Sequence, residues 1–170
     1  MGASTIAPMA FADALRALNA MKAQGVIEEY AVVGALAVVF WTEPLPTYDL
    51  DVFVFLAPSD AALVSLQGVY DWASKQGYAA HKEHIVIEGV PTQFLPSPNS
   101  LADEAIETAE TLDYEGVPVR VALPEYLVAL CLQPESRTPK RRERAAMLLE
   151  WPGLNRGRLD EILERYGLSL

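Results

Sequence analysis

One stretch decides the fold expected for this chain: residues 30–52, which read YAVVGALAVVFWTEPLPTYDLDV. Its first four residues are apolar and predict a short strand, Gly34 breaks that strand, and residues 35–41 predict a helix that starts directly at the glycine. A loop with two prolines follows at residues 43–46, and residues 49–56 predict a buried strand rich in valine and phenylalanine. The stretch therefore predicts a strand, a helix and a second strand in close succession.

Asp49 and Asp51 stand at the start of the second strand. Because side chains alternate between the two faces of a strand, these carboxylates are expected on one face, with Cα atoms roughly 6.6 Å apart. Leu50 and Val52 are then expected to point into the core. Two carboxylates at this spacing can bind Mg²⁺, and the free backbone N–H groups after Gly34 suit a polyphosphate. The alternative is a tight turn followed by solvated aspartates.

Segments with helical or strand-like apolar spacing flank this stretch on both sides. The expected elements are a helix over residues 8–24 ended by Gly25, a helix from an N-cap at Ser59 to about Gly77, a hairpin of residues 84–87 and 90–95, a helix over residues 101–109 and a strand over residues 117–122. Pro124 opens a C-terminal third that reads as helical. We therefore expect an α/β (α+β) domain in residues 1–122 and a helical subdomain in residues 123–170.

The composition describes a folded protein, with 51% hydrophobic and 21% charged residues among 170. The longest apolar run, residues 30–41, falls short of the ~20 residues that a membrane helix needs, so we expect a cytoplasmic protein without a membrane partner. The single cysteine, Cys131, excludes an internal disulfide and is expected in the core. His81 and His84 are three residues apart, which predicts opposite faces of a strand and argues against a shared metal.

Charge is distributed unevenly along the chain. The net charge is −10, and residues 1–136 carry 5 of the 13 basic residues but 18 of the 23 acidic ones. This acidic body argues against broad binding of duplex DNA, because phosphate neutralisation supplies most non-specific affinity. A basic segment follows, directly before a helix expected over residues 143–150, and it is either a clamp for phosphates or a solvated helix face. Its cations are Arg137, Lys140, Arg141, Arg142 and Arg144.

The runs VGALA at residues 33–37 and TYDLDV at residues 47–52 resemble the nucleotidyltransferase superfamily. The mark of its polymerase-β-like fold is Gly-Gly or Gly-Ser at a helix start, followed by Asp-x-Asp on the next strand. Residues 89–96, 101–105 and 124–130 are also similar to small bacterial nucleotidyltransferase-like proteins related to abortive-infection toxins. The resemblance implies a mixed sheet flanked by helices, with the helical subdomain closing over a cleft.

The resemblance also implies the roles of individual residues. Asp49 and Asp51 are expected to be catalytic and to hold Mg²⁺ or Mn²⁺, while Gly34, Ala35 and Thr47 are expected around a nucleoside triphosphate. Many relatives carry a third carboxylate where Gln93 stands here; an amide cannot take a proton at neutral pH, although its carbonyl oxygen could ligate a metal. The cations expected beside the nucleotide are Arg137, Lys140 and Arg144.

The function that the resemblance implies is transfer of a nucleotidyl group from a nucleoside triphosphate to an acceptor hydroxyl. The sequence leaves open whether this hydroxyl belongs to an RNA end, a protein or a small molecule, and it does not name the nucleotide or the oligomeric state. The alternative is a catalytically weakened nucleotide-binding relative that acts by protein–protein contact, for example as a component of a toxin–antitoxin pair.

Overall fold

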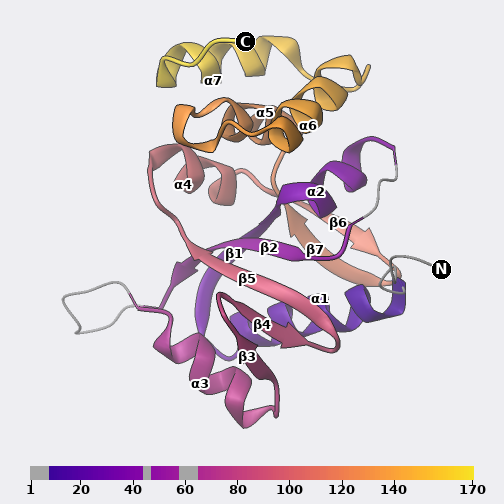
Figure 1. The fold of residues 1–170 in the computed structure, drawn as a ribbon, viewed down its shortest axis with the longest axis vertical. Helices are drawn as coiled ribbons and strands as arrows, with labels where there is room; N and C mark the ends of the chain where they lie inside the picture. Colours follow the sequence, from indigo (N-terminus) through magenta and orange to yellow (C-terminus); the bar gives the residue numbers. More distant parts are fainter. Residues whose placement is uncertain (1–7, 44–46, 58–64) are drawn as a thin grey trace.

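A mixed sheet of seven strands forms the middle layer of the molecule, in the order β3-β4-β5-β2-β1-β7-β6 (Figure 1). The structure is a computed structural model and describes residues 8–43, 47–57 and 65–170. β1 is antiparallel to β2 and parallel to β7, and β2 is parallel to β5, so the predicted α/β class with a mixed sheet is confirmed. The strands are β1 (Ile27–Val33), β2 (Leu50–Leu56), β3 (Ala79–His81), β4 (His84–Ile87), β5 (Val90–Pro96), β6 (Glu110–Tyr114) and β7 (Val117–Val121).

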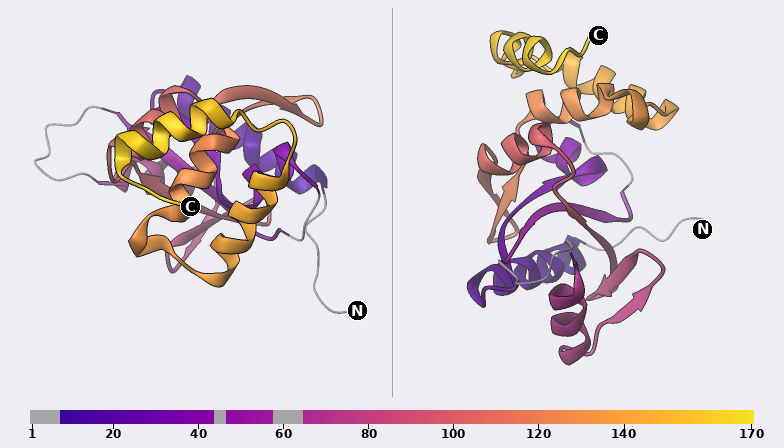
Figure 2. Two further views of the ribbon diagram at one scale, coloured as in Figure 1. Left: turned by 90° about the horizontal axis from the view of Figure 1, so that it is seen from above. Right: turned by 90° about the vertical axis from the view of Figure 1, so that its left-hand side faces the viewer.

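Helices cover the two faces of the sheet. α1 (Pro8–Ala23) and α3 (Gln67–Lys75) pack on one face, and α2 (Gly34–Trp41) and α4 (Ser100–Glu107) pack on the other (Figures 1 and 2). In β2, Leu50 is buried and Asp51 is half-buried, and this alternation continues along the strand. The half-buried face is the one that meets the start of α2. Within the described ranges, every helix is too short or too polar to span a bilayer.

The C-terminal third adds a layer of helices beyond α2 and α4 (Figure 1). Its elements are α5 (Pro124–Leu132), the short 3-10 helix η1 (Pro134–Ser136), α6 (Pro139–Glu150) and α7 (Arg156–Tyr166). α5 packs against α2 and α4 below it and against α6 and α7 above it. Glu125 of α5 is buried, and it accepts hydrogen bonds from Arg158 Nη1 at 2.7 Å and from the Asn155 backbone N–H at 3.4 Å. This ion pair, in which Glu125 is buried and Arg158 is partly exposed, holds the start of α7 on α5. The division at residue 122 stays a prediction.

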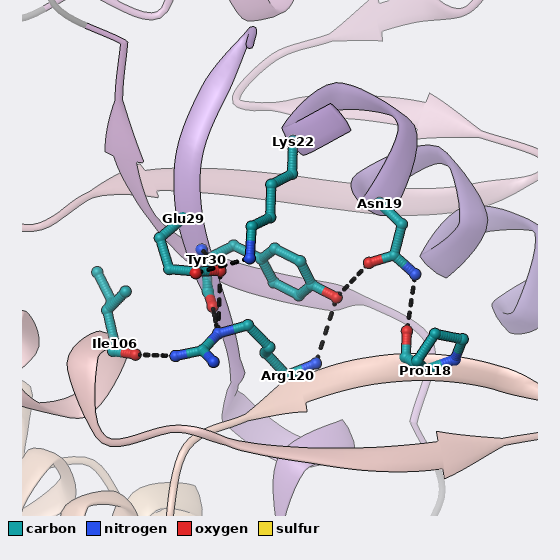
Figure 3. Close-up of polar contacts among 7 residues, drawn as sticks. All are labelled: Asn19, Lys22, Glu29, Tyr30, Ile106, Pro118 and Arg120. Carbon is teal, nitrogen blue, oxygen red and sulfur yellow. Dashed lines mark hydrogen bonds and ion pairs between the residues drawn. The ribbon is translucent and has the colours of Figure 1, made fainter. Parts of the chain in front are cut away.

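The junction of β1, β7 and α4 is held by the side chain of Arg120 (Figure 3). Its guanidinium donates hydrogen bonds to the carbonyl oxygens of Tyr30 at 3.2 Å and of Ile106 at 2.6 Å, and it lies 2.9 Å from Glu29 Oε1. The buried Tyr30 hydroxyl donates to Asn19 Oδ1 at 2.7 Å and accepts from the Arg120 backbone N–H at 3.2 Å. These side-chain hydrogen bonds therefore supplement the backbone pairing of β1 with β7, in which Val32 is the partner of Val121.

Most predicted elements are present, with boundaries that differ at several helix starts. Ser59 lies outside the described residues, and α3 begins at Gln67. α6 begins at Pro139 rather than at residue 143, because Thr138 caps it and accepts from the Arg141 N–H while Pro139 occupies the first turn. The basic segment, predicted before this helix, is thus largely its first two turns.

The expectation for His81 and His84 was wrong. They are directly opposite partners on β3 and β4, joined by a two-residue turn in which Lys82 has a φ of +56°. Opposite residues of an antiparallel pair point to the same face, so the two imidazoles share a face. The sequence-based argument treated the two histidines as members of one continuous strand and missed the turn between them. The edge strand β6 was also missed, since four of its five residues are polar or aromatic and none of the five is fully buried.

Candidate active site

The start of α2 brings a glycine and an aspartate into direct contact. Gly34 has a φ of +70°, and a Cβ atom at this position would lie 2.6 Å from Asp51 Oδ2. The Asp51 carboxylate therefore lies against the backbone at the point where α2 begins. The N-cap residue, Val33, has no side-chain acceptor for the first N–H groups of the helix. This helix start combines a close carboxylate with backbone donors, a combination that suits a phosphate bound through a cation.

Both aspartates line one cavity of about 380 Å³, which we call the polar cavity. Asp49 is exposed and Asp51 is half-buried. Across the cavity lie Lys140 and Arg144 of α6, one turn of helix apart. The remaining lining residues are Ala35, Thr47, Tyr48, Glu143 and Met147. The structure thus brings most of the predicted site residues together in one place.

A second cavity, of about 270 Å³, meets the polar cavity at Asp51 and Arg144, and we call it the apolar cavity. It lies between the sheet, α5 and the start of α6. Its apolar walls come mainly from Val33, Val38, Phe53, Leu95, Leu127 and Leu130, and its other lining residues include Gly34, Asn99, Cys131, Gln133, Glu135, Ser136 and Arg141. Burial raises the pKa of the Cys131 thiol, and the nearby Arg141 and Arg144 oppose this shift.

Arg137 has a different position from the one expected. It is not among the described residues that line the polar or the apolar cavity; it lines a third cavity, which includes Arg142, Ala146 and the chain end at Leu170. Its Nε donates a hydrogen bond to the Leu132 carbonyl at 3.3 Å. Arg137 precedes α6, and the cations within α6 are spread around the helix, so the basic segment lines different cavities.

The pKa of Asp51 is raised above its ordinary value. Burial is the largest cause and the neighbouring charge of Asp49 adds to it, whereas Arg144, His84 and Arg141 act in the opposite direction. Two carboxylates that face each other in a partly desolvated site disfavour each other's ionised form. A bound divalent cation would remove this penalty.

Gln93 lies beside Asp51 on the neighbouring parallel strand, since the two residues are partners in the pairing of β2 with β5. Laterally paired residues of a sheet point to the same face, so the Gln93 amide shares the face of the Asp51 carboxylate. Gln93 is half-buried and is not among the described residues that line either cavity. Asp51 and Gln93 are 42 positions apart in the chain and meet only because β2 and β5 pair.

The donor set fits a hard divalent cation that is bound together with a substrate. Among the residues that the structure describes, no group of three or more His, Cys, Asp or Glu side chains is placed to hold a metal. Mg²⁺ is commonly held by one or two carboxylates and completed by substrate phosphates and water, rather than by an all-protein cage. Asp49 and Asp51 supply the two carboxylates, and the Gln93 carbonyl oxygen is a neutral donor on the same face.

Several lining residues were not predicted from the sequence. Tyr48 lies between Thr47 and Asp49 and is 40% exposed, which is unusual for a large aromatic side chain in this chain. Glu143 and Met147 lie on the same face of α6 as the two cavity cations. The signal for this face was available: with a helix start at Pro139, positions 140, 143, 144 and 147 follow helical spacing.

No protein-family model and no curated protein matches the chain. A crystal structure of an antigenic nucleotidyltransferase-like protein from Paracoccidioides brasiliensis is similar, with a TM-score of 0.61 and 14% identity over 96% of this chain and 89% of that one.

The antibiotic-resistance factor ANT(2'')-Ia is also similar in structure. Its solution structure has a TM-score of 0.56 and 14% identity, over 95% of this chain and 93% of that one. Its crystal structure in complex with adenylyl-2"-tobramycin has a TM-score of 0.57 and 14% identity, over 92% of this chain and 97% of that one. The likeness spans nearly the full length of each chain, including the helical C-terminal third. This chain therefore has a nucleotidyltransferase-like fold.

Proposed function

We propose that this protein binds a nucleoside triphosphate with Mg²⁺ in the polar cavity and transfers its nucleotidyl group to an acceptor hydroxyl. The observation that carries the proposal is the composition of that cavity: two aspartates beside the start of α2, opposite Lys140 and Arg144, within a nucleotidyltransferase fold. Carboxylates, backbone N–H groups and cations around one space are what a metal–triphosphate complex requires.

The charges of the polar cavity support binding of the triphosphate as its metal complex. Three carboxylates, those of Asp49, Asp51 and Glu143, outnumber the two cations, Lys140 and Arg144. The side chains alone therefore sum to −1, and a triphosphate would be repelled. One bound divalent cation changes the sum to +1. Nucleotide affinity is accordingly expected to depend on Mg²⁺ and to be lost on chelation.

The residues of the chain then have distinct tasks. Asp49 and Asp51 hold the cation, and the backbone at Ala35 donates to phosphate oxygens at the positive end of α2. Arg144 can bind phosphate oxygens through two parallel N–H donors, and Lys140 adds a point charge. The cation, when bound, neutralises charge on the phosphates during the transfer. The exposed ring of Tyr48 offers a stacking surface for the nucleobase.

A second candidate, a nucleotide-binding protein with weakened catalysis, is favoured by one observation. The residue next to Asp51 on the same sheet face is Gln93, and an amide cannot accept the proton of an acceptor hydroxyl at neutral pH. Such a protein would bind nucleotide and act by contact with another protein, as in a toxin–antitoxin pair.

One experiment distinguishes these candidates. The purified protein is incubated with each α-labelled nucleoside triphosphate, Mg²⁺ and either total RNA or a small-molecule extract. Transfer of label supports the enzyme, whereas binding without transfer supports the second candidate. Gln93→Glu is the informative variant: a positioned general base contributes typically ~10²- to 10⁴-fold, so a gain of that order would identify the missing group. Absence of Mg²⁺-dependent binding would refute both candidates.

A further inference from the structure

The polar and the apolar cavity extend in opposite directions from one side chain. Asp49, directly before β2, lines the polar cavity; within β2, Asp51 lines both cavities and Phe53 lines the apolar cavity. Arg144 is a second wall that the two cavities share. The proposed function gives the polar cavity its occupant and leaves the apolar cavity without one, although both end at the same carboxylate.

The geometry of phosphoryl transfer decides which reactant the apolar cavity can hold. In the transfer, the attacking oxygen and the leaving oxygen lie roughly in line on opposite sides of the phosphorus. With the pyrophosphate portion of the nucleotide beside Lys140 and Arg144 in the polar cavity, the acceptor hydroxyl has to approach from the other side of Asp51. The apolar cavity opens on that side. The exposed Tyr48 in the polar cavity also offers the nucleobase a place outside the apolar cavity.

The lining of the apolar cavity indicates what kind of acceptor it fits. Its walls are mainly aliphatic and aromatic, with a few neutral polar side chains, and its charged groups balance in number, with the carboxylates of Asp51 and Glu135 and the guanidinium groups of Arg141 and Arg144. A polycation such as tobramycin, named with ANT(2'')-Ia, would bring several amines against leucines in a lining that has no excess of carboxylates to pair them, which is costly. An RNA end would bring phosphates for which this lining has no excess of cations.

The size of the apolar cavity restricts the acceptor further. Its volume of about 270 Å³ lies just below the ~300–1,000 Å³ typical of sites for drug-sized ligands. A single ring with a short substituent fits such a space, whereas an oligosaccharide or a polynucleotide does not.

We infer that the apolar cavity is the acceptor site and that the acceptor is a small uncharged alcohol or phenol. This inference rests on the proposed function and specifies its second substrate. The acceptor oxygen forms a bond to the α-phosphorus while the bond from that phosphorus to pyrophosphate breaks. Pyrophosphate leaves with the electron pair of the broken bond, the hydroxyl proton passes to solvent water, and the products are pyrophosphate and the nucleotidyl ester of the acceptor.

The test uses variants that fill one cavity at a time. Ser136→Trp narrows the apolar cavity from its half-buried rim, where added bulk need not disturb the core, and Phe53→Trp narrows it from the sheet. Ala146→Trp adds a tryptophan in the third cavity and is the matched control. Calorimetry measures binding of the α,β-methylene analogues of the four common nucleoside triphosphates with Mg²⁺, and saturation-transfer NMR measures binding of phenol and of tobramycin. Thermal unfolding of each variant shows that it is folded.

We expect the wild type to bind at least one analogue and phenol, but not tobramycin. Both filling variants should bind the analogue within about threefold of wild type and phenol at least about tenfold more weakly, while the control matches wild type. Loss of the analogue in the filling variants would overturn the inference, because the nucleotide would then occupy the apolar cavity. Nucleotide binding would stand in that case, but its proposed place in the polar cavity would not. The inference would also be overturned if both filling variants still bound phenol as the wild type does. It would equally be overturned if the wild type bound tobramycin and the filling variants did not. If the wild type binds no analogue, the proposed function fails and the inference fails with it.

Discussion

Gly34→Ala is expected to have two effects, a loss of stability from backbone strain and a loss of Mg²⁺ binding from displacement of Asp51, and a second glycine variant separates them. An alanine in the left-handed region costs roughly 1–2 kcal/mol, and Gly34 has a φ of +70°. The new Cβ would lie 2.6 Å from Asp51 Oδ2, so the carboxylate has to retreat by about 0.8 Å to reach an ordinary contact of 3.4 Å. Mg²⁺ needs its ligands at 2.0–2.1 Å in near-octahedral geometry and does not tolerate such a displacement.

The control is Gly25→Ala, which places an alanine at a φ of +76° with no atom within 4 Å of the added Cβ. Both variants should lose roughly 1–2 kcal/mol of unfolding free energy in urea, a shift of about 2–8 °C in Tm. Only Gly34→Ala should weaken binding of the Mg²⁺–nucleotide complex by more than about tenfold, or about 1.4 kcal/mol, in calorimetry. Equal loss of binding in both variants, or normal binding in Gly34→Ala, would refute the reasoning.

Three further predictions concern other parts of the molecule. Replacing Lys140 and Arg144 together by alanine should weaken nucleotide binding by more than about tenfold, with a shallower salt dependence and an unchanged Tm. The control is Arg142→Ala, on the same helix but lining the third cavity. An equal loss of nucleotide binding in this control would contradict the assignment. Arg120→Met leaves two carbonyl oxygens without their donor. At roughly 1–3 kcal/mol for each unsatisfied group, the free energy of unfolding measured in urea should fall by about 2–6 kcal/mol. A fall below about 1 kcal/mol would show that solvent replaces the guanidinium. Because burial raises the pKa of Cys131, less thiolate is present at neutral pH, and alkylation by iodoacetamide should be slow there. The alkylation rate should increase with pH, with a midpoint above the ordinary thiol pKa. A midpoint below the ordinary thiol pKa would contradict the burial of this side chain.

The core of the candidate site could be predicted from the sequence because its parts are close together in the chain. Gly34 has to adopt a positive φ between a strand and a helix, and the two aspartates follow at the start of the next strand, Asp49 directly before it and Asp51 within it. The hairpin turn at Glu88 and Gly89 is equally local, with φ values of +50° and +81°. Local backbone requirements of this kind restrict the residue types at a few adjacent positions, and the restriction is visible in the sequence.

Only the tertiary structure decided which distant residues join the aspartates. The cations of residues 137–144 are close together in sequence, yet Lys140 and Arg144 of α6 line the polar cavity while Arg137, before α6, lines a third cavity. The packing of α6 against α5 and α2 determines this choice, and no local pattern records it. Gln93 reaches Asp51 only through the pairing of β2 with β5. The apolar cavity is likewise a gap between the sheet, α5 and α6, and its shape follows from how these elements pack. The sequence shows that most of the lining side chains are apolar, but it does not show that they leave a space beside the aspartates.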